Sequence, residues 1–185
     1  MNTANQLSRR SFLAATAKLS AAGLVASRVE SLFAADAATA REPAWQLGCY
    51  TRVFDQFEYP VALDAIAEAG FKYVGLMTTK TKDWVMIKTT TPVEEVQAMH
   101  KEAAKRGLKV LSVYGDFSVT DSLEVGIRGL KQLIDDTVIC QCSNLMLGGT
   151  SDEKLYQTYY KTIAECCDYA ATKGVGLSIK PHGGQ

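Results

Sequence analysis

The chain has 185 residues, of which 47% are hydrophobic, enough to form one globular core. Its 20 basic and 20 acidic residues balance; without residues 1–40, 16 basic and 18 acidic residues remain, a net charge of −2. Because no basic stripe survives, nucleic acid is excluded as an expected ligand.

Residues 1–40 differ sharply from the rest of the chain. The motif SRRSFL, with Arg9 and Arg10, precedes a weakly apolar segment that is too short and interrupted to be a permanent membrane helix. Small residues suited to signal-peptidase cleavage follow at positions 35–40. The motif resembles the twin-arginine export signal. We therefore expect a signal peptide and linker on a bacterial protein that is exported folded, to the periplasm or beyond, without a stable membrane anchor. The alternative is an amphipathic helix or a disordered tail.

From Gln46 onward, the sequence repeats one pattern: a short apolar run, a loop, an amphipathic segment and a helix-ending residue. The apolar runs predict five strands, at Gln46–Thr51, Lys72–Met77, Lys109–Tyr114, Asn144–Leu147 and Val175–Lys180. Four helices are expected between them. A residue that favours the left-handed conformation is predicted at the end of each helix: Gly70, Gly107, Asn144 and Gly174.

Three of the helices are predicted to begin at a capping residue that lies three positions before a glutamate. These pairs are Thr91–Glu94, Asp121–Glu124 and Thr150–Glu153. In the first pair, Pro92 is expected at the first helical position, where its missing N–H costs nothing. The last helix is predicted to bury one apolar stripe: Leu155, Tyr159, Ile163, Cys166 and Ala170.

Strand–helix alternation without tight hairpins predicts parallel strands joined by right-handed crossovers. Two architectures fit five such strands: an open doubly wound sheet of the flavodoxin type, and a (β/α)₈ barrel without its second half. Either fold needs a helix after the fifth strand, and no such helix precedes Gln185. Residues 41–185 are therefore expected to be part of a longer fold, and to aggregate or stay loosely packed when produced alone.

Ligands of both folds bind at the carboxyl ends of the strands. Alternation along the fifth strand places Ser178 and Lys180 on the face that would point into a barrel. The same parity assigns Tyr50 of the first strand to that face, together with Ser112 and Tyr114 of the third. Two further candidates lie in the loops beyond the strands: Asp116 and His182.

Five of these side chains can bind a polyhydroxylated ligand through hydroxyl, carboxylate and ammonium groups: Tyr50, Tyr114, Asp116, Lys180 and His182. Lys180 is the strongest candidate, because a lysine that points inward at a strand end requires a counter-charge or a ligand. The alternatives are that the tyrosines only pack and that Asp116 only begins a turn.

The five cysteines indicate no metal site, and the sequence lacks the common nucleotide-binding and hydrolase motifs. An odd number of cysteines cannot pair fully within one chain, and their spacings lack the two CxxC pairs of a structural zinc site. The sequence also contains neither a P-loop nor the G-x-G-x-x-G, G-x-S-x-G and H-E-x-x-H motifs.

Four stretches carry a resemblance to a known family: WQLGCYTRVF, ALDAIAEAGFKYVGL, HKEAAKRGLKVLSVYG and YAATKGVGLSIKPHGG. In this order they resemble the sugar phosphate isomerase/epimerase family, whose members are xylose isomerase-like TIM barrels. The resemblance covers residues 45–185. It implies a partial (β/α)₈ barrel that contains the first five strands and four helices.

The resemblance also implies an activity and a cofactor. Members move a proton at the carbon next to a carbonyl, and commonly bind a divalent metal through a glutamate that ends the fifth strand and three ligands from later strands. This sequence has Lys180-Pro181 where the family usually has Glu-Pro, so the cofactor is left unknown and no metal ligand is expected before Gln185.

Three hypotheses stay open for the complete protein. The first is a sugar isomerase or epimerase, with Lys180 and His182 as catalytic groups and with Tyr50, Tyr114 and Asp116 binding the substrate. The second is a sugar lyase of the same family that works without the usual metal. The third is a non-catalytic sugar-binding barrel. In each case the expected partner is a small carbohydrate, and association of identical chains stays open.

Overall fold

The computed structural model describes residues 45–80, 84–119 and 122–180. Residues 1–40 and His182 lie outside these ranges, so the export signal and the position of that histidine stay predictions. From Gln46 onward the chain forms one compact unit. None of the described helices is both long and apolar enough to cross a bilayer.

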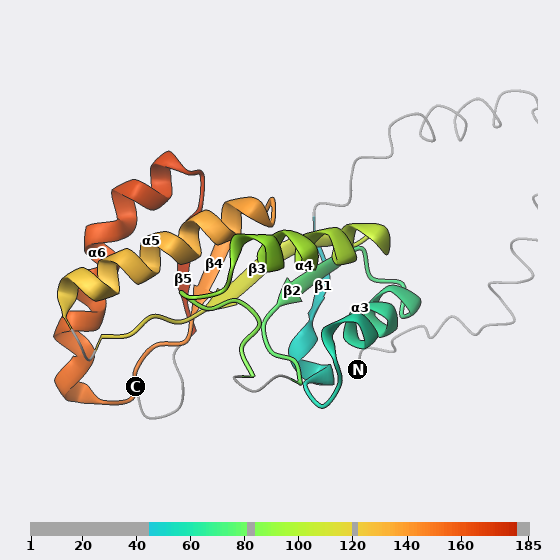
Figure 1. The fold of residues 1–185 in the computed structure, drawn as a ribbon, viewed down its shortest axis with the longest axis horizontal. Coiled ribbons are helices and arrows are strands. Elements are labelled where there is room, and N and C mark those ends of the chain that lie inside the picture. The colour runs from blue at the N-terminus through green and yellow to red at the C-terminus, as the bar shows by residue number, and fades with distance from the viewer. Residues whose placement is uncertain (1–44, 81–83, 120–121, 181–185) are drawn as a thin grey trace, which may run out of the picture. The chain divides into compact units, whose positions relative to one another are not determined.

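Five parallel strands form one sheet in the order β1-β2-β3-β4-β5 (Figure 1). Their bounds are β1 Gly48–Tyr50, β2 Tyr73–Leu76, β3 Lys109–Gly115, β4 Asn144–Leu147 and β5 Gly176–Ile179. All five predicted strands are thus confirmed, with small differences at their ends. A doubly wound sheet reverses its strand order at a switch point. The sequential order of these five strands is instead that of a barrel.

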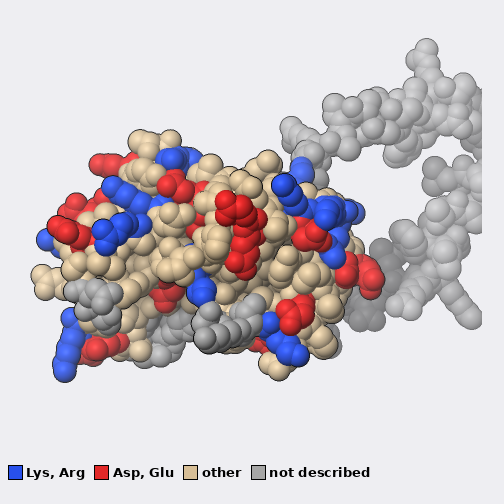
Figure 2. Space-filling model, in the orientation of Figure 1, with Lys and Arg blue, Asp and Glu red and all other residues tan. Residues whose placement is uncertain are grey.

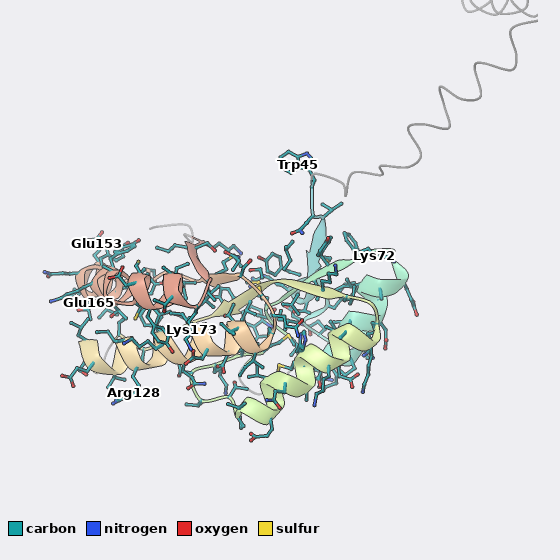
Figure 3. The ribbon with its side chains drawn as sticks, turned by 90° about the horizontal axis from the view of Figure 1, so that it is seen from above. Trp45, Lys72, Arg128, Glu153, Glu165 and Lys173 are labelled. Carbon is teal, nitrogen blue, oxygen red and sulfur yellow. The ribbon has the colours of Figure 1, made fainter. Side chains whose placement is uncertain are left out.

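Four α-helices alternate with the strands: α3 Tyr59–Glu68, α4 Val93–Lys105, α5 Leu123–Ile139 and α6 Glu153–Thr172. A short 3₁₀ helix, η2 at Thr51–Phe54, follows β1. Figures 1 and 3 show α4 and α5 along one side of the strands. On that side a Cβ added to Gly115 of β3 would press on Leu133 of α5. Figure 2 shows acidic and basic side chains interspersed over the helical face. We call the opposite side of the sheet the inner face.

The helices end in left-handed residues, as predicted at Gly70, Gly107 and Gly174, where φ is 88°, 70° and 69°. The prediction for the third helix was wrong: Gln141, with φ of 52°, ends α5, and Asn144 begins β4. Behind Gln141, the Cys142 N–H donates to a carbonyl of the last turn at 3.1 Å. This bond satisfies a carbonyl of the last helical turn. It helps to stabilise Gln141 in the left-handed conformation that glycine adopts at the other three helix ends.

Three helices begin later than predicted from the capping residues that lie three positions before a glutamate. Pro92 is the N-cap of α4 rather than its first helical residue. The side chains of Ser122 and Asp152 cap α5 and α6, each accepting a hydrogen bond from a backbone N–H of the first turn. Serine and aspartate are among the best N-capping residues, so Ser122 and Asp152 can take this role next to the first helical turn.

The predicted apolar stripe of α6 is confirmed at four of its five residues, Tyr159, Ile163, Cys166 and Ala170, which are buried. The fifth, Leu155 in the first turn, is half-buried. The stripe lies beside α5, where Gly126 leaves room for the Thr162 side chain. At the end of α6, Lys173 forms an ion pair with Asp135 of α5 at 2.9 Å (Figure 3). The two helices are thus joined by an apolar seam and an ion pair at its edge.

All five cysteines are free thiols. Burial raises the thiol pKa at four of them: Cys49, Cys140, Cys142 and Cys166. The effect is large at Cys140, whose pKa rises to about 12. Cys167 is exposed on α6.

Asp136 of α5 is a buried carboxyl group and predicts a pH dependence of stability. Its Oδ1 accepts a hydrogen bond from Gln132 at 3.0 Å, whereas its Oδ2 has no hydrogen-bond partner. Burial, with a smaller contribution from the charge of Asp135, raises the pKa of Asp136 from 3.8 to about 6. Folding therefore shifts the equilibrium of this carboxyl group toward its neutral form, relative to the unfolded chain.

This group's contribution to stability is fully present below pH 3.8 and is lost as the pH rises through about 6. The ionised form costs the folded protein about 3 kcal/mol. We expect Asp136→Asn to raise the free energy of unfolding above pH 6 and to leave it nearly unchanged in acid. Denaturant unfolding of both proteins on either side of pH 6 measures this, and an equal loss at both pH values would contradict it.

Candidate functional site

Tyr50 lies across the inner face of the sheet, the side to which sequence parity assigned it. It pairs in register with Gly75 of β2, and a Cβ at that glycine would overlap the tyrosine ring. The Tyr50 hydroxyl donates to Met146 Sδ of β4 at 3.7 Å. The side chain thus reaches from the first strand to the fourth, and Gly75 provides the space for it.

Tyr114 of β3 is the second predicted tyrosine on this face, and it pairs in register with Met146. Its hydroxyl lies against Gly148, just beyond β4, where a Cβ would overlap it. Burial raises the pKa of the Tyr114 phenol; the charge of Asp116 adds to the rise and that of Arg52 opposes it. The hydroxyl therefore stays protonated at neutral pH and can donate a hydrogen bond to a ligand.

A chain of polar side chains crosses the middle of the inner face. Asn144 Nδ2 of β4 donates to Ser112 Oγ of β3 at 2.8 Å, and Ser178 Oγ of β5 donates to Asn144 Oδ1 at 3.1 Å. The sequence predicted the inward direction of both serines. It missed Asn144, which was assigned to a helix end. The chain links three strands on the side where a ligand would bind.

Asp116 follows β3 at the carboxyl end of the sheet, as predicted. Its Oδ1 accepts a hydrogen bond from the Phe117 N–H at 2.9 Å, which is the local turn contact of the alternative interpretation. The exposed side chain also lines a pocket of about 380 Å³ together with Lys88 and Ser118. Asp116 is therefore placed both to hold its loop and to contact a ligand in that pocket.

Lys180 directly follows β5, and its backbone N–H donates to the Leu147 carbonyl at 2.9 Å. By alternation it belongs to the same side as Ser178, and the residue is exposed. Among the residues that the structure describes, no carboxylate lies within ion-pair distance of its ammonium. The charge that sequence analysis singled out is thus available to a ligand.

The donor groups at this end of the sheet do not fit the divalent metal that the family resemblance implies. A lysine ammonium has no lone pair for a metal, and its charge repels a cation. Within the described ranges, no three His, Cys, Asp or Glu side chains lie close enough together to hold an ion. No catalytic step is therefore assigned to a metal.

Two further residues at this end were absent from the sequence-based set. Arg52, in η2, places its guanidinium carbon 4.9 Å from the centre of the Trp84 ring. Trp84 lies in the segment between β2 and α4 and has a positive φ of 65°. Arg52 follows Tyr50 by two residues, and this closeness to a predicted site residue could have identified it from the sequence. Trp84 belongs to no periodic pattern, so only the folded chain brings it to Arg52.

A sequence model of the family described as xylose isomerase-like TIM barrel matches residues 63–185. No curated protein matches the sequence. Three solved structures illustrate what the fold is similar to. A xylose isomerase-like TIM barrel protein from Mycobacterium smegmatis, in complex with magnesium, matches with a TM-score of 0.56 at 15% identity, covering 74% of this chain and 55% of that chain.

The second structure is a D-psicose 3-epimerase in the presence of D-fructose, with a TM-score of 0.54 at 13% identity, covering 73% of this chain and 52% of that chain. The third is a sugar phosphate isomerase/epimerase from Parabacteroides distasonis, with a TM-score of 0.54 at 13% identity, covering 78% of this chain and 54% of that chain.

At these identities the likeness to solved structures shows the fold alone. This chain spans about half the length of those structures, in agreement with a sheet that contains five of the eight strands of a barrel. The family model matches more than half of the chain, from within α3 to its last residue. The chain therefore belongs to the xylose isomerase-like TIM barrel family.

Proposed function

We propose that the protein is a sugar isomerase or epimerase, which acts on a carbohydrate or carbohydrate derivative by moving a proton at the carbon next to a carbonyl. The observation that carries this proposal is the polar inner face of the sheet, with tyrosine hydroxyls and the Ser112–Asn144–Ser178 chain. Lys180 follows at its carboxyl end and pairs with no carboxylate among the described residues. The fold is that of solved proteins that include a D-psicose 3-epimerase and a sugar phosphate isomerase/epimerase.

Each candidate residue has a role in this proposal. The Lys180 ammonium donates to the carbonyl oxygen of the substrate and stabilises the negative charge that develops there when the neighbouring carbon loses its proton. His182 transfers that proton. The hydroxyls of Tyr50 and Tyr114 and the carboxylate of Asp116 hold hydroxyl groups of the sugar.

Proton exchange with solvent tests the proposed reaction directly. We expect the full-length protein, incubated in heavy water with a panel of ketoses and aldoses, to replace the hydrogen next to the carbonyl of one sugar with deuterium. Proton NMR would show that signal disappear while the signals of an isomer or epimer grow. If no sugar of the panel exchanges faster than in the protein-free control, the proposal fails.

A metal-independent sugar lyase is the second candidate function, and Lys180 favours it. Where the family usually has a carboxylate, an ammonium can stabilise the same negatively charged intermediate, from which a leaving group departs instead of a proton returning. The same spectra separate the two reactions, because elimination produces a vinylic proton signal and isomerisation does not. A sugar-binding barrel without catalysis would show neither change while it still binds the sugar.

A further inference from the structure

We propose that Trp84 is a stacking platform for the apolar face of a sugar, and that Arg52 holds its ring in place. This assignment deepens the proposed function, on which it rests, by naming a residue that recognises the ring of the substrate. It follows from three independent features of Trp84: its strained backbone, its exposed side chain and its contact with the guanidinium of Arg52.

The backbone at Trp84 is held in a conformation that a tryptophan rarely adopts. Its φ of 65° lies in the left-handed region, which is sterically strained for a bulky residue. Hydrogen bonds on both sides maintain it: the Trp84 carbonyl accepts from the Thr79 N–H at 2.9 Å, and the Met86 N–H donates to the Met77 carbonyl at 3.0 Å. The segment therefore folds back on the end of β2 and presents Trp84 at a fixed position.

One buried residue anchors both members of the Trp84–Arg52 pair. Thr51, fully buried after β1, accepts a hydrogen bond from the Met77 N–H at 3.0 Å and donates to Met86 Sδ at 3.4 Å. Arg52 is the next residue along the chain, and Trp84 lies two residues before that methionine. The spacing between guanidinium and ring is thus fixed by the core and does not depend on two free side chains meeting.

The ring itself keeps a large accessible surface. Trp84 is 43% exposed although it is among the largest apolar side chains of the chain. Arg52 lies over the ring, and among the described residues it has no carboxylate partner that would compete for it. The attraction between the guanidinium and the ring stabilises this arrangement. A second molecule can therefore stack on the surface that remains.

The position of the pair points toward the candidate site. Burial raises the pKa of the Tyr114 phenol, and Arg52 is close enough for its charge to oppose part of that rise. Tyr114 belongs to the inner face, and Arg52 and Trp84 follow β1 and β2 at the same carboxyl end of the sheet. A sugar held by the hydroxyls of the inner face would reach the indole with its C–H groups, and ligand pockets commonly combine such aromatic surfaces with a few polar groups.

Fluorine NMR tests this assignment independently of turnover. The full-length protein is labelled with 5-fluorotryptophan, and the Trp84 resonance is identified by its loss in Trp84→Phe. Titration with D-fructose, D-glucose and D-glucuronate is expected to shift that resonance saturably with at least one sugar, while the Trp45 resonance stays in place. Glycerol at equal concentration controls for bulk solvent effects.

Kinetics with the sugar that shifts the resonance supply a second readout. Trp84→Ala is expected to raise KM about tenfold with little change in kcat, because a stacking platform binds the ground state and the transition state alike. Trp84→Phe keeps an aromatic surface and should recover most of the loss. Arg52→Lys should retain more affinity than Arg52→Ala, and Trp45→Phe is the neutral control.

The outcomes separate this inference from the proposed function. A Trp84 resonance that no sugar shifts overturns the stacking platform, whether or not the protein turns a sugar over. So does an unchanged KM in Trp84→Ala. A saturable shift without any proton exchange would support the platform while the isomerase proposal fails.

Discussion

Replacing Lys180 by alanine is expected to lower kcat of the full-length protein about 100-fold or more, because the developing negative charge on the substrate oxygen would lose its nearest cation. Lys180 follows the last described strand on the side of the inner face, and no described carboxylate neutralises it. Steady-state kinetics on the sugar that undergoes exchange would measure the effect. Lys180→Arg should retain part of the activity if charge alone matters.

The matched control for this prediction is Lys109→Ala. Lys109 is an exposed lysine that begins β3 and thus lies at the opposite end of the sheet. Its replacement should change neither kcat nor KM. Wild-type activity in Lys180→Ala would remove this lysine from the mechanism, and the binding-barrel hypothesis would gain weight.

Gly75→Ala is expected to destabilise the full-length protein by about 1–3 kcal/mol, the usual range for an atom forced into a packed interior. The new Cβ would overlap the ring of Tyr50 along one edge, at Cγ, Cδ1 and Cε1, rather than at the hydroxyl group. The ring must then leave the inner face, so substrate binding should weaken together with stability. Denaturant unfolding and KM measured on the same preparation would test both effects.

Gly176→Ala is the matched control, because it makes the same change in another strand. There a Cβ would meet only the Ser143 carbonyl at 3.6 Å, an ordinary contact. A double-mutant cycle sharpens the comparison: in a Tyr50→Ala background, Gly75→Ala should cost almost nothing. Equal costs for Gly75→Ala with and without the tyrosine would refute the steric explanation.

The order and type of the elements could be predicted from the sequence, because hydrophobic periodicity and glycines at helix ends are local signals. Asn144–Leu147 was predicted with the same bounds as β4, and Gly70, Gly107 and Gly174 have the expected positive φ. The choice between an open sheet and a barrel needed the strand order. That order depends on contacts between distant segments, which local patterns do not contain.

The candidate site was predicted in part, for the same physical reason. Strand parity is local, and it assigned Tyr50 and Tyr114 to the side on which both are found. The hydrogen bonds of Asn144 and the contact of Arg52 with Trp84 join residues 32 or 34 positions apart in the chain, so no local sequence pattern reveals them. A left-handed tryptophan is also contrary to propensity, and only the surrounding hydrogen bonds make it stable.

The unpaired cysteines bear on the export that the twin-arginine motif predicts. A thiol must lose its proton before it attacks a disulfide, and shielding from water keeps Cys49, Cys140, Cys142 and Cys166 in the protonated form. A protein that folds before it crosses the membrane would carry these sulfurs into an oxidising compartment already protected from cross-linking. Exposed Cys167 is then the position where oxidants and neighbouring chains would react first.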